Sequence, residues 1–248
     1  MQILPGIEPS GFPARTELVL AREVRLWTIR SSAVGAADPE DLTDEILMTA
    51  VTGDDVERLA AAAWLVGRSE LPVGGLDLGQ AVESRARALN AGDDFEALSY
   101  VEAQMSLALI DRSVRKCRRR LSDFARKADS LYVPLAAYYL AQLGDPAGWP
   151  AISGAARRAN EQIRIGAARN LVGFLPYDGQ LVDGAKVDVL GALHAGLVDP
   201  SVFVRREAPA LIAEAAGSRA RSLLDPLAAS DDDEVRAAAQ SVLEQLAG

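Results

Sequence analysis

Cysteine and histidine are almost missing from this chain of 248 residues, which has one of each, Cys117 and His194. Conventional zinc sites need several such ligands, so we expect neither a metal ion nor another cofactor. A lone cysteine cannot form an internal disulfide, and this favours a reducing compartment. Cysteine–histidine catalysis would have to use these two residues, but both lie among apolar residues in patterns typical of packing. We therefore expect no catalytic residue.

Other familiar signals are missing as well. No run of residues approaches the roughly 18 apolar positions of a membrane span. Residues 1–13 lack a basic region followed by an apolar run, so no signal peptide is recognisable. The glycine-rich motifs that cradle phosphates and the spacing of a calcium-binding loop are not found either. These absences favour a cytoplasmic protein that makes no contact with a membrane.

Aromatic residues make up only 5% of the chain, and the alternation of apolar and polar residues that is typical of strands is scarce. Hydrophobic residues nevertheless make up 49%, with alanine and leucine the most frequent. Small residues let helix axes approach each other, and long apolar residues fill the remaining gaps. The composition therefore predicts an all-α fold.

The net charge of −9 is unevenly distributed. Residues 1–110 carry 8 basic and 18 acidic side chains, residues 111–127 carry 8 basic and 2 acidic, and residues 128–248 carry 10 basic and 15 acidic. A largely acidic surface repels nucleic acid and attracts basic proteins. The short basic segment is the exception.

A weak pattern returns in the second half of the chain. It consists of an apolar anchor, an arginine, and an alanine four positions after the anchor. It occurs as Ile163-Arg164-Ala167, Val204-Arg205-Ala208 and Val235-Arg236-Ala239. Val133 and Ala137 repeat it with Pro134 in place of the arginine, and the four anchors are 30, 41 and 31 residues apart. A two-helix unit that returns at this length indicates stacked helical repeats.

Helix-breaking residues and helix-capping residues divide the chain into three parts. Residues 1–14 are rich in proline and glycine and are expected to form an extended arm. Residues 15–128 form an atypical helical half, in which Asp38 and Pro39 are expected to start a helix. Residues 129–248 carry the repeats. We expect helices at 15–34, 39–51, 54–67, 79–90, 93–109, 111–128, 130–143, 146–158, 160–174, 183–197, 201–216, 219–229 and 231–246.

The repeats resemble the HEAT-like family, including its short bacterial type. The best match is Asp199, Val204 and Arg205, an acidic turn residue followed five and six positions later by valine and arginine. The resemblance implies a right-handed α-solenoid of stacked antiparallel helix hairpins, continuous with the preceding half. It also implies that Arg164, Arg205 and Arg236 join neighbouring repeats through turn aspartates and carbonyls. The alternative is that these arginines bind an acidic partner.

The basic segment predicts an amphipathic helix. Its apolar residues recur at spacings of three and four, as Val114, Cys117, Leu121, Phe124 and Ala128. Most basic side chains lie away from this stripe, and the candidates for partner binding are Arg112, Arg115, Lys116, Arg119 and Arg120. The alternative is a solvated helix face, or one that the acidic helices nearby neutralise. Because no aromatic residues lie between the arginines, a stacking surface for single-stranded nucleic acid is not expected.

The function predicted from these features is a non-catalytic protein-binding or scaffolding module that uses a solenoid groove for a basic protein partner. Two alternatives stay open. The chain could be a structural subunit whose arm contacts a neighbour, or a HEAT-like nucleic-acid-binding protein or DNA glycosylase. Glycosylases of this kind use a tryptophan and an aspartate in a basic groove, for which Trp149 and Asp145 are the nearest match. The acidic composition argues against the nucleic-acid alternative.

Overall fold

A computed structural model of the chain describes residues 17–68, 81, 82, 84, 85, 88, 94–110 and 114–247. These residues are predominantly helical, which confirms the all-α class. The chain divides into two compact units, with Leu20–Tyr132 in the first and the residues from Val133 onward in the second. No helix among the described residues is long and apolar enough to cross a membrane. The expected arm at 1–14 lies outside the described residues.

The first unit is built around two closely packed helices, α3 and α5. Its elements are α1 (Glu17–Val34), η1 (Pro39–Asp41), α2 (Asp44–Thr52), α3 (Val56–Arg68), α5 (Asp94–Ile110) and α6 (Val114–Lys127). Serines on α5 allow the close approach, because the Ser99 hydroxyl donates to the Val56 carbonyl at 2.6 Å and the Ser106 hydroxyl donates to the Ala63 carbonyl. The helix expected at 79–90 falls largely outside the described residues.

The single helix expected at 39–51 is wrong. Pro39–Asp41 forms one turn of 3₁₀ helix, and α2 begins only at Asp44. The reason is a second capping residue, Thr43, whose Oγ1 accepts a hydrogen bond from the Ile46 amide at 3.3 Å. The carboxylate of Asp41 bonds back to the Asp38 amide at 3.1 Å, which closes the short turn on itself.

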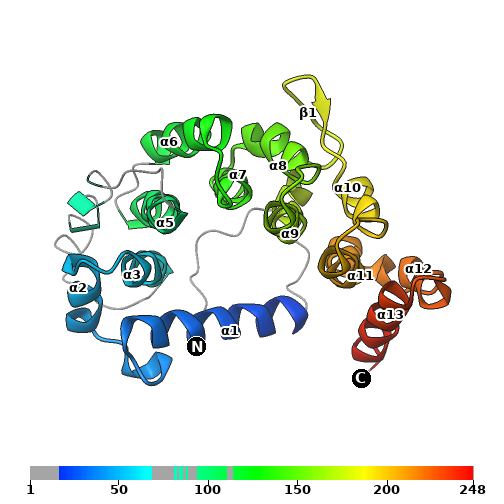
Figure 1. The fold of residues 1–248 in the computed structure, drawn as a ribbon, viewed down its shortest axis with the longest axis horizontal. Coiled ribbons are helices and arrows are strands. Elements are labelled where there is room, and N and C mark those ends of the chain that lie inside the picture. Colours follow the sequence, from blue (N-terminus) through cyan, green and yellow to red (C-terminus); the bar gives the residue numbers. More distant parts are fainter. Residues whose placement is uncertain are drawn as a thin grey trace. The chain divides into compact units, whose positions relative to one another are not determined.

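The second unit has two rows of helices (Figure 1). One row holds α7 (Val133–Gln142), α9 (Glu161–Asn170), α11 (Val202–Ala216) and α13 (Asp233–Gln245), and each contacts the next. The other row holds α8 (Trp149–Ala155), α10 (Val189–Gly196) and α12 (Ala220–Leu224). Short 3₁₀ turns join them: η2 (Pro146–Gly148), η3 (Leu171–Tyr177), η4 (Gly217–Arg219) and η5 (Leu227–Ala229).

The repeating anchors form the core of the first row. All four anchors and the four alanines that follow them are at most 6% exposed: Val133, Ala137, Ile163, Ala167, Val204, Ala208, Val235 and Ala239. The alanines let consecutive helices approach closely, and the large side chains of Leu140, Phe174 and Ile212 are fully buried in the same unit. The last helix, α13, buries Val242 against α11 and α12. Gln240 of the same helix is exposed, and its Nε2 donates to the Ala228 carbonyl of η5 at 3.3 Å.

The helix expected at 183–197 is wrong in its first turn. Residues 181–186 form a hairpin instead, in which β1 (Leu181–Val182) pairs antiparallel with β2 (Ala185–Lys186). Asp183 and Gly184 make the turn with positive φ of 50° and 80°. Asp-Gly between apolar residues is a strong hairpin signal, and the helix predicted at 183–197 did not take it into account. This insertion accounts for the 41-residue spacing between two of the anchors.

Because η2 packs closely on α7, we expect one methyl group added at Gly148 to lower the stability of the fold. A Cβ at Gly148 would lie 2.8 Å from the backbone Cα and O of Ala137. We expect Gly148→Ala to lower the free energy of unfolding by about 1–3 kcal/mol, because backbone rather than a flexible side chain must move. Urea unfolding followed by circular dichroism measures this loss.

The matched control is Gly154→Ala in α8, where an added Cβ meets no atom within 4 Å. There we expect a gain of about 0.5–1 kcal/mol from the higher helix propensity of alanine. Equal effects of the two substitutions would contradict the close packing of η2 on α7.

Candidate functional site

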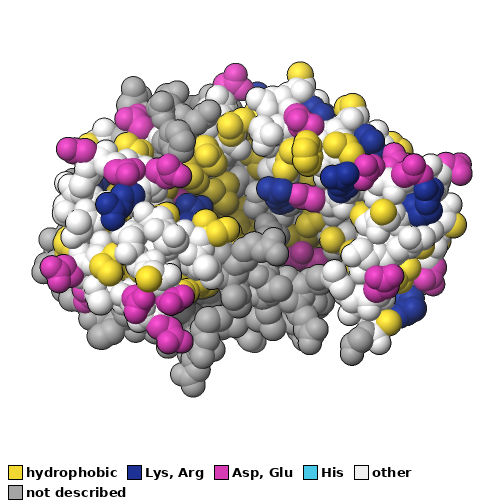
Figure 2. Space-filling model, turned by 60° about the horizontal axis from the view of Figure 1, so that its bottom comes forward, with side chains coloured by type: hydrophobic (Ala, Val, Ile, Leu, Met, Phe, Trp, Pro, Cys, Tyr) yellow, Lys and Arg dark blue, Asp and Glu magenta, His cyan; other side chains and the backbone are white. Residues whose placement is uncertain are grey.

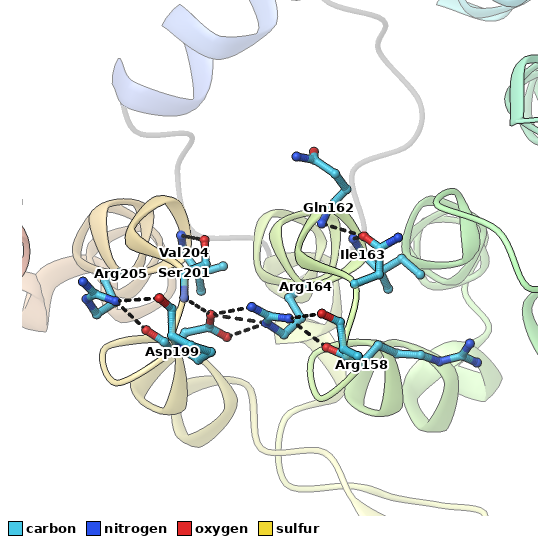
Figure 3. A network of polar contacts seen from close by, with 11 residues as sticks. Arg158, Gln162, Ile163, Arg164, Asp199, Ser201, Val204 and Arg205 are labelled. Atoms are coloured by element: carbon cyan, nitrogen blue, oxygen red, sulfur yellow. Dashed lines mark hydrogen bonds and ion pairs between the residues drawn. The ribbon is translucent and has the colours of Figure 1, made fainter.

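Arg164 joins two consecutive turns of the second unit (Figure 3). Its Nη1 donates to the carbonyls of Arg158 and Ala159, at 2.9 and 2.8 Å, in the turn before its own helix. Its Nε and Nη2 donate to the Asp199 carboxylate in the next turn, at 3.0–3.2 Å. Asp199 also accepts a hydrogen bond from the Ser201 amide at 2.7 Å. One side chain therefore satisfies polar groups in two repeats.

Arg205 of α11 makes the same kinds of contact at the next first-row helix. Its Nη1 donates to the carbonyls of Asp199 and Pro200, at 2.7 and 3.1 Å. Its Nε lies 2.8 Å from Oδ2 of Asp232, which belongs to the following turn. The connection thus runs from Arg164 through Asp199 to Arg205 and on to Asp232, and we call it the arginine ladder.

Arg236 stands at the end of the arginine ladder. Its Nη1 donates to the Ser230 carbonyl at 2.6 Å, as its counterparts do in their turns. Its Nη2 bonds to Asp233 of its own turn rather than to a later repeat. In the first repeat Pro134 takes the arginine position, so the arginine ladder begins only at Arg164. Arg164, Arg205, Arg236 and Asp199 thus all make contacts in the turns that precede first-row helices.

A capping residue three positions before each anchor was missed in the sequence. These residues are Ser130, Asn160, Ser201 and Asp232, and each accepts a hydrogen bond from a backbone amide two or three residues later. Such caps satisfy amides that a helix start leaves without partners. Ser, Asn and Asp at one fixed offset from a recurring anchor are a signal that aligned repeats would have given.

The first row of helices also carries ion pairs at the surface. Arg169 of α9 pairs with Glu207 of α11, its Nε donating at 2.6 Å, and Arg206 of α11 pairs with Glu234 of α13. Figure 2 shows basic and acidic side chains alternating in a row over this unit, in the right half of the view. Phe203 of α11 is 53% exposed, one helical turn from Arg206 and Glu207. We call these five residues the α9–α13 face.

Hydrogen bonds of this unit shift the pKa values of four groups, Arg169, Arg206, Asp232 and Glu234. The hydrogen bond from Arg206 lowers the pKa of Glu234, and the hydrogen bond to Glu207 raises the pKa of Arg169. The pKa of Asp232 is lowered chiefly by the Val235 amide, with smaller effects from the Glu234 amide and Arg205. The carboxylates at the start of α13 are thus held in their charged form.

The basic helix α6 buries the expected stripe, with Cys117, Leu121 and Phe124 at most 6% exposed. Of the partner-binding candidates, Arg115, Lys116 and Arg119 are exposed, and Arg112 lies outside the described residues. Arg120 is half-buried, and its Nη1 donates to Oε1 of Gln104 at 3.2 Å. It therefore holds α6 against α5. Arg118 is half-buried as well.

The residues considered for chemistry occupy structural positions. Trp149 is 4% exposed, and its Nε1 donates to the Lys186 carbonyl at 3.1 Å, while Asp145 caps η2. This pair therefore does not line an open groove as a glycosylase site would. His194, expected in the core or partly exposed among its leucine neighbours, is exposed, and α10 buries Val189 and Leu193 instead. No described group of His, Cys, Asp and Glu is arranged to hold a metal ion.

No protein-family model matches the chain, and the search of curated proteins found no match either.

The arginine ladder predicts an ordered series of stability losses. We expect Arg164→Ala to lower the free energy of unfolding by about 2–4 kcal/mol, because two carbonyls lose their donor and the nearly buried Asp199 carboxylate loses its counter-charge. Arg205→Ala should cost less and Arg236→Ala least, following side-chain exposures of 11%, 21% and 37%. Urea unfolding measures the series, with exposed Arg157→Ala as a control that changes stability by at most about 0.5 kcal/mol. The largest loss at Arg236 would contradict this order.

The lowered pKa values at the start of α13 predict a pH dependence. A carboxylate with a folded-state pKa below its ordinary value stabilises the folded state above that ordinary value, 3.8 for Asp232. The stabilisation is lost as pH falls through the folded-state pKa. Asp232→Asn keeps a capping side chain and removes the charge, so the variant should melt below the parent near neutral pH. The difference in melting temperature between parent and variant should shrink in acid. If the two melting temperatures instead change with pH in parallel, the stabilising role of the Asp232 charge is disproved.

Proposed function

We propose that the second unit is a right-handed α-solenoid of the HEAT-like type and that it serves as a non-catalytic protein-binding or scaffolding module. Three regularities support this. A buried anchor recurs at the same position of each first-row helix, and a capping residue stands three positions before every anchor. Arg164 and Arg205 each connect the turn before their own helix with the next turn. Repeats of this kind contact only their neighbours and present a continuous row of helices as a binding surface.

The observation that carries the binding role is the α9–α13 face. The arginine ladder and the two surface ion pairs cross from helix to helix, so the face is organised before any partner arrives. An organised surface loses less conformational entropy on binding than a flexible one. Exposed Phe203 lies beside Arg206, and aromatic residues and arginine are both enriched at protein interfaces. We infer that Phe203 is the apolar anchor of the interface.

The chemistry of the partner follows from charge. The chain has a net charge of −9, and each carboxylate of the α9–α13 face is already paired with an arginine. The face itself is therefore close to neutral, while the field of the whole chain attracts positively charged molecules. A basic protein with an apolar patch at its contact surface fits both properties. The surface charges would speed its association more than they strengthen the complex.

Site-directed crosslinking tests this proposal. Phe203 is replaced by the photoreactive amino acid benzoylphenylalanine, and crosslinked proteins from the native source are identified by mass spectrometry. We expect a basic protein that crosslinks here and not from the same replacement at Ser222, an exposed residue of α12. Phe203→Ala should weaken binding of that protein by about tenfold. Equal crosslinking at both positions, or turnover of a substrate by the purified chain, would refute the proposal.

A further inference from the structure

The geometry points to a second interaction surface in the first unit: the exposed side of α6 binds an acidic, extended segment of another protein. Three arginines define this surface, Arg115, Arg119 and Arg126, and all three are exposed. None of them pairs with a carboxylate among the described residues, whereas Arg169 and Arg206 in the other unit do. We call these three residues the α6 face.

The α6 face is held rigidly. Cys117 and Leu121 are fully buried beneath it, and Phe124 stacks on Tyr100 of α5 with ring centroids 5.8 Å apart. Arg120 fixes the same helix to α5 through Gln104. The three arginines lie on the side of the helix opposite this buried stripe, within about 40° of one another at 100° per residue. Their charges therefore point the same way from a fixed support.

The spacing suits an extended peptide. Arg115 and Arg119 are four residues apart, about 6 Å along the helix axis, and Arg126 lies about 10 Å further. Alternate side chains of an extended chain are separated by about 6.7 Å and point to one side. Acidic residues at alternate positions would meet Arg115 and Arg119 in succession and reach Arg126 after a gap. Arginine–carboxylate contacts of this kind are charge-assisted and often bidentate.

One residue favours a protein partner over nucleic acid. Asp123 is exposed on the same side of α6, between Arg119 and Arg126 along the axis. A nucleic-acid strand carries a phosphate at every step and would bring one close to this carboxylate. A peptide can place an uncharged residue there. The acidic residues exposed on α2 and α3 add a long-range repulsion of polyanions, which a short acidic segment feels less.

The test uses the full chain and a fluorescent peptide in which glutamate alternates with serine. The variant Arg115→Glu, Arg119→Glu, Arg126→Glu should bind this peptide more weakly by about tenfold or more, since each exposed pair contributes modestly. The control Arg157→Glu, Arg219→Glu, Arg221→Glu makes the same change in net charge at exposed positions of the second unit, and it should stay within about twofold of the parent. Binding by the parent should weaken with salt.

Three results would overturn the inference: no saturable binding by the parent, equal losses in the two triple variants, or duplex DNA bound more tightly than the peptide at the same salt. If the first triple variant has a lower melting temperature than the parent, the single variant Asp123→Arg tests the inference instead. It removes the interrupting carboxylate and should tighten peptide binding by about threefold, and unchanged or weaker binding would refute the proposal. Phe203→Ala should leave peptide binding unchanged, so this surface and the α9–α13 face are judged separately.

Discussion

The backbone carbonyls of the turns that precede the first-row helices need hydrogen-bond donors, and at α9, α11 and α13 of the second unit an arginine supplies them. Carbonyls that are buried without a donor are costly, and a guanidinium offers five donors in a fixed geometry. Arg164 uses them in two directions, toward the carbonyls of its own turn and toward Asp199 of the next. Asp199 in turn holds the Ser201 amide, so the start of α11 depends on an arginine of the previous repeat.

This coupling relates the core to the surface. The anchors and their alanines give each pair of neighbouring helices apolar contact, but apolar contact alone tolerates sliding. The directional bonds of the arginine ladder set the register, and the register places Arg169 opposite Glu207 and Arg206 opposite Glu234. Exposed ion pairs of this type contribute little to stability. Their positions are therefore a consequence of the register, and this makes the α9–α13 face suitable for recognition.

Part of this organisation could be predicted from the sequence. Buried anchors, the arginines beside them and the range of α11 follow from helical spacing, which is a local property. The hairpin at 181–186 was missed because its signal is two residues long, Asp183 and Gly184, within a segment that otherwise suits a helix. Thr43 was missed because Asp38 offered an earlier cap. The contact of Arg120 with Gln104 joins two helices, and spacing within one helix cannot indicate it.

A double-mutant cycle between Arg164 and Asp199 tests the central claim most directly. The free energies of unfolding of the parent, Arg164→Ala, Asp199→Ala and the double variant give the coupling between the two repeats without the other contacts of either residue. The account predicts a coupling of about 1–3 kcal/mol, because the pair is nearly buried and the side chains are bonded through two nitrogens. Additivity to within about 0.5 kcal/mol would contradict it and leave apolar packing alone to hold the repeats in register.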